Sequence, residues 1–296
     1  MKTLTIALLG ATLLVSQNAP GPKPIALTIR EGTNMAAALS PDRRTLMIDL
    51  QGSLWTLPAS GGPAKRVTEE FLDARQPAWA PDSRRVAFQG YSDGVWHIYV
   101  MNADGSDIHP ISVNYVNEFD PAVLPDGRIL FGRWEYIDKN ALTIQSLWTI
   151  NPDGSQESAY YANNMVFPKA LLDARPVPNS TLVAATLAKH NGPPRGSIGL
   201  IDVRLGKNNP DAISNLEHPE SPTFDTGDSC EPWPISENLV LFSGQPKGAK
   251  KNAIEMIDRQ GNLHVGIAIT VSIHLQDLTG IVEADLEMTG IAVARE

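Results

Sequence analysis

A repeated turn constrains the fold of this chain more than any other feature. In Ala80-Pro81-Asp82-Ser83 the proline presets φ for the first corner of a tight turn, and the aspartate caps the second corner. Related turns occur in four other places: Leu39-Ser40-Pro41-Asp42, Leu124-Pro125-Asp126-Gly127, Val177-Pro178-Asn179-Ser180 and Trp233-Pro234-Ile235-Ser236. Successive prolines are 40, 44, 53 and 56 residues apart, a drifting period that is typical of four-stranded propeller blades.

A second set of positions supports the same repeat. After each turn comes a β-like run and then a further apolar strand, for example Leu54-Trp55-Thr56-Leu57 and Ile98-Tyr99-Val100-Met101. Turn clusters such as Asn102-Ala103-Asp104-Gly105-Ser106 and Asn151-Pro152-Asp153-Gly154-Ser155 follow, and Asp-Gly between apolar runs favours a hairpin. The two sets agree over five units, so the sequence predicts an all-β protein.

The repeat extends over nearly the whole chain. At roughly 45 residues for each blade, six blades would use nearly all 296 residues as one domain. The run 25–29 has no hairpin of its own, and we expect it to close the ring with the tail, since closure removes exposed strand edges. The expected blades are 34–68, 75–112, 120–161, 175–213, 231–265 and a last blade from 266–296 with 25–29.

The amino terminus has the features of a secretory signal. Met1-Lys2-Thr3 is a short basic leader, Leu4 to Val15 is apolar, and polar residues follow. We expect a signal peptide over 1–19 and a single propeller domain over 20–296, with no membrane span after its removal. A buried N-terminal strand or helix is the alternative. The signal predicts a periplasmic or secreted protein.

Composition argues against several classes of partner and cofactor. The formal net charge of −9 disfavours nucleic acid, because binding a phosphate backbone normally needs a basic face. Cys230 is the only cysteine, so the chain has neither an intrachain disulfide nor a Cys-x-x-Cys-His haem site. The six histidines are dispersed without a metal-ligand spacing, and we therefore expect no metal and no cofactor.

The Pro-Asp turn, the following β-run and the Asn-x-Asp-Gly hairpin resemble the repeat of TolB-type β-propellers, most plainly between Arg30 and Ser112. The resemblance implies a secreted or periplasmic protein that serves in protein interaction. From 119 to 265 the chain is similar to the propeller region of hydrazine synthase alpha-subunit-like proteins, through 131–138, 147–154, 196–202 and 233–237. Hydrazine synthesis is not implied, because the chain lacks the c-type haem motif on which that chemistry depends.

Two long insertions are the candidate binding loops, since loops on one face of a repeat fold carry binding. They are 133–140 and 188–196, which concentrate charge and aromatic surface. Asp73-Ala74-Arg75 also recurs as Asp173-Ala174-Arg175; it forms either a ring of charges around the central opening or, as we favour, an ion pair or turn cap between blades. The candidate ligand or partner residues are Arg133, Glu135, Asp138, Arg175, His190 and Arg195.

No catalytic constellation stands out in the sequence. Gly196-Ser197-Ile198-Gly199 is one residue short of a nucleophile elbow, and Asn102-Ala103-Asp104-Gly105-Ser106-Asp107 opens like a calcium loop but lacks the distal glutamate. The first hypothesis is therefore a monomeric, secreted or periplasmic scaffold that binds a protein or peptide and has no catalytic centre. The alternative is a subunit or fragment of a multidomain hydrazine-synthase-like or hydrolase-associated enzyme.

Overall fold

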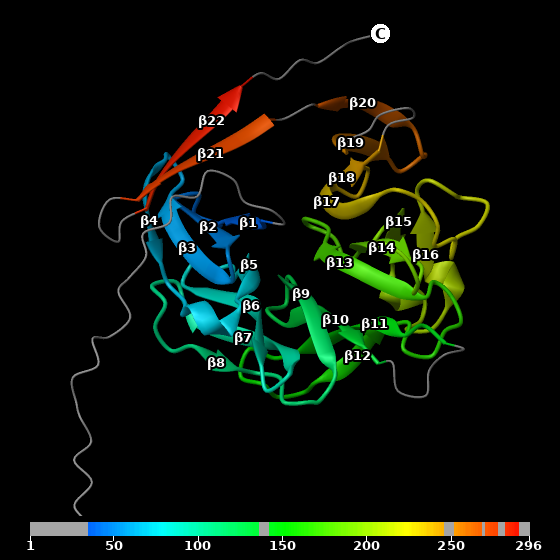
Figure 1. Ribbon diagram of the computed structural model, residues 1–296. Coiled ribbons are helices and arrows are strands. Elements are labelled where there is room, and N and C mark those ends of the chain that lie inside the picture. The colour runs from blue at the N-terminus through cyan, green and yellow to red at the C-terminus, as the bar shows by residue number, and fades with distance from the viewer. Residues whose placement is uncertain (1–34, 136–141, 246–251, 268–269, 278–281, 290–296) are drawn as a thin grey trace, which may run out of the picture.

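The computed structural model describes residues 35–135, 142–245, 252–267, 270–277 and 282–289. In these ranges the regular structure is β-strand, apart from three short 3₁₀ helices, Glu70–Leu72, Val203–Leu205 and Pro210–Ala212. Five four-stranded antiparallel units follow one another around a common centre, and we number them blades 1 to 5 (Figure 1). No helix of the described part is long and apolar enough to span a membrane.

Blades 1 and 2 are regular meanders in which each strand pairs with the next. Blade 1 also carries the hairpin β21–β22 on its outer strand. The strands are β1 Ala37–Leu39, β2 Thr45–Leu50, β3 Ser53–Pro58, β4 Gly62–Arg66, β5 Arg75–Trp79, β6 Arg85–Ser92, β7 Val95–Asn102, β8 His109–Pro110, β21 Thr270–Asp277 and β22 Val282–Thr289.

Blades 3, 4 and 5 repeat the same meander. A single parallel contact between Gln145 and Ala170 joins blade 3 to blade 4. The strands are β9 Asn117–Val123, β10 Ile129–Trp134, β11 Gln145–Ile150, β12 Ser158–Tyr161, β13 Ala170–Pro176, β14 Val183–Ala188, β15 Gly196–Ile201, β16 Ile213–Asn215, β17 Cys230–Ser236, β18 Leu239–Gly244, β19 Ala253–Asp258 and β20 Leu263–Ile267.

The repeated turn lies where the first strand of a blade meets the second. Pro81 follows β5, and the turn is closed by a hydrogen bond of 3.0 Å from the Ser83 amide to the Ala80 carbonyl. In blade 5 the expected position is wrong by two residues. Pro234 lies inside β17, opposite Val240, and the chain turns after Ser236. The ladder is irregular between Pro234 and Ser236, because a proline has no amide to donate to it.

The end of the chain pairs with the first blade. Val282, Glu283 and Ala284 of β22 lie opposite Ala64, Pro63 and Gly62 of β4. Within the described ranges no strand pairing joins blade 5 to blade 1, and six blades are not established. A last blade from 266–296 with 25–29 stays a prediction, and both 25–29 and the expected signal peptide, 1–19, lie outside the described residues.

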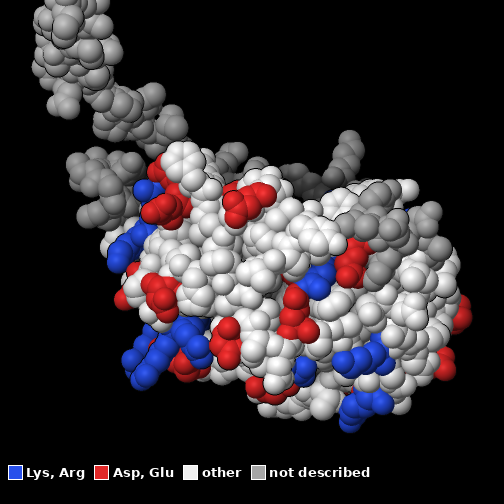
Figure 2. Space-filling model, turned by 90° about the horizontal axis from the view of Figure 1, so that it is seen from below, with Lys and Arg blue, Asp and Glu red and all other residues white. Residues whose placement is uncertain are grey.

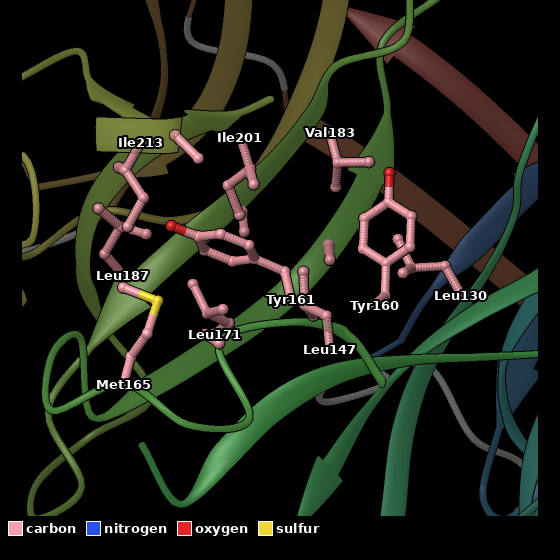
Figure 3. Close-up of a cluster of buried hydrophobic side chains, with 14 of the residues drawn as sticks. Leu130, Leu147, Tyr160, Tyr161, Met165, Leu171, Val183, Leu187, Ile201 and Ile213 are labelled. Carbon is pink, nitrogen blue, oxygen red and sulfur yellow. The ribbon is translucent and has the colours of Figure 1, made fainter. Parts of the chain in front are cut away.

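The largest hydrophobic cluster lies between blades 3 and 4 (Figure 3). Tyr161 is at its centre with no exposed surface, and its hydroxyl donates to the Asn209 carbonyl at 2.7 Å. Leu147, Leu171 and Leu187 come from three different strands and are also fully buried. Each such side chain contributes about 1.5–3 kcal/mol by leaving water, so the contact between blades supplies much of the stability.

The side of the ring shown in Figure 2 has no large region of one charge among the described residues. Figure 2 shows acidic and basic side chains interspersed on a mostly uncharged surface. Several of these form ion pairs close together in sequence, such as Arg128 with Asp126 at 2.8 Å and Arg204 with Asp202 at 2.6 Å. Exposed pairs of this kind contribute little to stability, about 0–1 kcal/mol each. Further polar groups lie nearer the centre and line a cavity there.

Candidate functional site

A cavity of about 760 Å³ lies at the centre of the ring. The first strands of blades 2 to 5 line it, together with Met35 and Ala36, which precede β1. Trp134 at the end of β10 also lines it, as do residues from loops between second and third strands, among them Lys189, His190, 192–195 and Asn252. In an antiparallel meander these loops lie on the same face as the connections between blades, so the cavity opens on that face.

Blades 2 to 5 each present one polar side chain to the cavity from an unusual backbone position. The residues are Gln76, Asp120, Asp173 and Glu231, with φ of 51°, 56°, 51° and 55°. In every case the strand pairing shifts register at this point, which marks a β-bulge. A positive φ is uncommon for residues other than glycine, and such strain is retained where surrounding contacts hold it.

In blades 2 to 5, the backbone amide of the bulge residue donates a hydrogen bond to a side-chain oxygen of the preceding blade. Asp49 in β2 accepts the Gln76 amide at 2.8 Å, and Gln89 in β6 accepts the Asp120 amide at 3.0 Å. We call this series the inter-blade relay.

The inter-blade relay continues through blades 4 and 5. Asp120 accepts the Asp173 amide at 3.3 Å, and the Asp173 carboxylate accepts the amide of Glu231. Each otherwise unpaired bulge amide thus has an acceptor.

The carboxyl groups in this relay take up protons more readily than usual. Burial, followed by the charges of Asp120 and Glu231, raises the pKa of Asp173 to about 8. Burial also raises the pKa of Asp120 and of Asp49. The negative charge of each carboxylate disfavours ionisation of the other, which adds to the effect of burial on the pKa of Asp120 and Asp173.

Cys230 also lines the cavity, next to Glu231. Burial, and then the Glu231 charge, raises the pKa of its thiol to about 11. The thiolate is the reactive form of cysteine, so Cys230 is a poor nucleophile here.

Three of the candidate residues lie at or beside the cavity. His190 and Arg195 line it, and the His190 ring lies 6.4 Å from that of Trp134 between centroids. Arg175 stacks 4.8 Å from the centre of the Trp233 ring, and its charge only partly opposes the rise that burial causes in the pKa of Asp120 and Asp173. The structure therefore brings these three side chains to one region, and their binding role stays a prediction.

The candidate residues Arg133 and Glu135, from blade 3, do not line the cavity. The Arg133 side chain is buried, donates through Nε and Nη2 to Glu118 Oε1 at 3.0 and 2.7 Å, and lies 4.0 Å from the Trp148 ring centre. Glu135 is not among the residues that line the cavity, although its amide donates to the Ile144 carbonyl at 2.7 Å and fixes the base of the loop. Asp138 lies outside the described residues.

The two Asp-Ala-Arg segments are not equivalent in the structure. Asp73 and Arg75 form an ion pair of 2.9 Å within the connection into blade 2. Asp173 instead occupies the bulge position of blade 4, which corresponds to Gln76 and not to Asp73. The ion pair of the favoured reading thus occurs in the first segment, but within one connection and not between blades. In the second segment the Asp173 carboxylate lines the cavity and also accepts the Glu231 amide of the next blade.

The other motifs have structural roles. The Ser197 hydroxyl is buried and donates to the Phe224 carbonyl at 2.6 Å. Asp104 accepts the Ser106 amide at 2.9 Å in a hairpin turn. Across the described ranges, no group of three or more His, Cys, Asp or Glu side chains could hold a metal ion.

Sequence analysis missed Gln76, Asp120 and Glu231, although a signal was present. Gln76 and Asp120 lie five positions before the turn prolines Pro81 and Pro125, and each of the three residues is itself followed by proline. Counting back five positions from the turn prolines finds Gln76 and Asp120, but it does not find Glu231, which lies three positions before Pro234.

The comparisons with known proteins were made for the sequence and for the fold. No family model matches the sequence. An uncharacterized protein of Agrobacterium fabrum, Atu1656, is 24% identical over 151 residues, which are 48% of this chain and 50% of that protein. The match thus spans about half the length of this curated relative.

Solved structures establish the fold. A protein described as TolB from Agrobacterium tumefaciens aligns over 79% of this chain and 80% of its own, with a TM-score of 0.60 and 15% identity. The fold is that of a TolB-like β-propeller. Hydrazine synthase of Kuenenia stuttgartiensis matches this propeller over 85% of the chain and 40% of its own, with a TM-score of 0.61 and 13% identity. A gluconolactonase of Xanthomonas campestris covers 88% of the propeller and 84% of its own chain, with a TM-score of 0.54 and 14% identity.

Proposed function

We propose that the protein is a secreted or periplasmic binding propeller that holds a protein or peptide partner on the face where the central cavity opens. The distribution of exposed aromatic side chains carries this proposal. Six aromatic side chains with 38% to 93% of their surface exposed lie in the connections between blades or at the ends of second strands, where the loops to the third strands begin. They are Phe71, Tyr91, Tyr115, Trp134, Phe167 and Phe224.

All six belong to one face, because these connections and loops share one side of an antiparallel meander. Among the described residues, the one other exposed aromatic side chain is Trp233 in β17, and no exposed aromatic side chain lies in the turns of the opposite face. Aromatic residues are enriched at protein interfaces, where they bury large area at low cost in conformational entropy. Exposing six of them on one face without a partner would be unusual for a monomer.

The first test is site-specific photocrosslinking in cells that produce the full chain. A photoreactive phenylalanine analogue replaces Tyr115 in one variant and Leu205 in a control, since Leu205 is also exposed, at 57%, but lies in the outer connection after β15. We expect a discrete adduct with a protein or peptide from position 115 and none from position 205.

Equal adducts from both positions would contradict the proposal, as would the absence of an adduct at 115 and at a second tested position, Phe71. Fractionation of the same cells tests the compartment. The proposal requires the mature chain, lacking the expected signal over 1–19, to be outside the cytoplasm.

A second candidate function is catalysis in the central cavity. The raised pKa of Asp173 favours it, because a carboxyl group protonated near neutral pH can act as a general acid. The gluconolactonase among the structural neighbours suggests gluconolactone as the substrate to try. Turnover that is lost in Asp173→Asn would support catalysis, whereas no turnover by the folded protein would favour binding.

A further inference from the structure

The loop between β14 and β15 brings two basic side chains to the mouth of the cavity. Lys189 and Arg195 both line it, and Arg195 is partly buried. Within the described ranges, neither side chain forms a hydrogen bond or an ion pair. Most other arginines near the centre are engaged: Arg75 pairs with Asp73 and Arg133 with Glu118.

The loop is held at its base, so these two charges have defined positions. The Arg195 amide donates to the Pro193 carbonyl at 2.7 Å. Gly196 exchanges two backbone hydrogen bonds with Ser229, of 2.9 and 3.1 Å, which join the loop to the entrance of blade 5. A Cβ atom on Gly196 would lie 1.7 Å from the Leu187 carbonyl oxygen, so this close approach requires glycine.

Among the described residues, no acidic group of the cavity forms an ion pair with these two cations. Asp49 accepts two backbone amides, those of Ala36 at 2.7 Å and Gln76 at 2.8 Å, and Asp120 and Asp173 accept amides from the next blades. Glu231 lies on the same wall as Arg195, yet no ion pair within 4 Å joins them in the described part. Two cations are therefore available at the cavity mouth of a protein whose net charge is −9.

We propose that Lys189 and Arg195 together bind a carboxylate of the protein or peptide partner, so that an acidic segment enters the cavity mouth. This inference rests on the proposed binding function and specifies the chemistry of the partner. Arginine presents a planar set of donors that fits a carboxylate, and hydrogen bonds to charged groups are the stronger ones. The exposed Trp134 beside His190 supplies an apolar wall for the same segment.

The test uses two fluorescent peptides of one length, one with three glutamate or aspartate residues around a tryptophan and one with the corresponding amides. Fluorescence anisotropy with the mature full chain gives both affinities. We expect the acidic peptide to bind at least about tenfold more tightly, which corresponds to about 1.4 kcal/mol. The preference should shrink as salt is raised, because exposed charges are screened.

Matched variants assign the effect to this loop. Lys189→Ala with Arg195→Ala should remove the preference for the acidic peptide. Arg44→Ala with Arg84→Ala removes the same charge from exposed turns on the opposite face and should leave the preference intact. Equal binding of both peptides, or equal losses in both double variants, overturns the proposal.

The photocrosslinking experiment separates the two ideas. Suppose that the adduct at Tyr115 still forms in the variant Lys189→Ala with Arg195→Ala, and that the protein shows no preference for the acidic peptide. These two results would support the binding function and contradict the carboxylate site. Competition by phosphate or citrate as strong as that by the acidic peptide would indicate a site for small anions and would also overturn the assignment to a protein segment.

Discussion

Replacing Arg133 by alanine will destabilise the protein by about 3–5 kcal/mol, because the change leaves Glu118 as a buried carboxylate without its cation. Glu118 has no exposed surface, and its Oε2 atom has no hydrogen-bond partner among the described residues. The guanidinium also packs on Trp148, whose contact would be lost as well. Urea denaturation followed by tryptophan fluorescence measures the change in the free energy of unfolding.

Arg128→Ala is the matched control. Arg128 is in the same blade and pairs with Asp126, but both side chains are exposed, so the expected loss is about 0–1 kcal/mol. A second variant that combines Arg133→Met with Glu118→Gln should recover part of the loss, since it removes the buried charge. If Arg133→Ala were as stable as Arg128→Ala, the ion pair would not be structural, and the expected ligand role of Arg133 would regain support.

Raising the pH from about 5 to about 8.5 will lower the free energy of unfolding, and Asp173→Asn will weaken this dependence. The pKa of Asp173 is about 8 in the folded protein, against a usual 3.8, so the folded state binds more protons than the unfolded state between these values. Stability then falls as pH rises through that window. Urea denaturation at several pH values measures the slope.

Asp126→Asn is the control for this titration. Burial alone would raise the pKa of Asp126, but the hydrogen bonds and the charge of Arg128 together outweigh burial and lower this pKa below its usual value. The group is therefore ionised in both states over the same window. Its replacement should therefore not change the slope. An unchanged slope in Asp173→Asn would mean that the carboxyl pair in the cavity does not hold a proton near neutral pH.

The sequence predicts the β-meander well because turn chemistry is local. Proline and aspartate at a turn determine φ and a cap within four residues, and four of the five turn prolines lie between the first and second strands of a blade. The fifth turn was predicted at Pro234, which instead lies inside β17. The role of this proline depends on its pairing with β18 and not on its neighbours in sequence.

The candidate site was predicted only in part, for a physical reason. Loop length and polarity pointed to His190 and Arg195, which the structure places at the cavity. Arg133 lies in the same kind of segment, but its burial depends on Glu118 and Trp148, which are distant in sequence. Whether a charged side chain faces solvent, a cavity or a buried partner is decided by tertiary contacts that spacing alone does not contain.

The inter-blade relay links the motions of the blades in series. Each bond joins a side chain of one blade to a backbone amide of the next, from Asp49 to Gln76 and onward to Glu231. A local opening of one blade thus frees the bulge amide of its successor and exposes it to exchange with solvent. Such coupling is reciprocal, so loosening of any one blade weakens the hold on the bulges of the blades bonded to it.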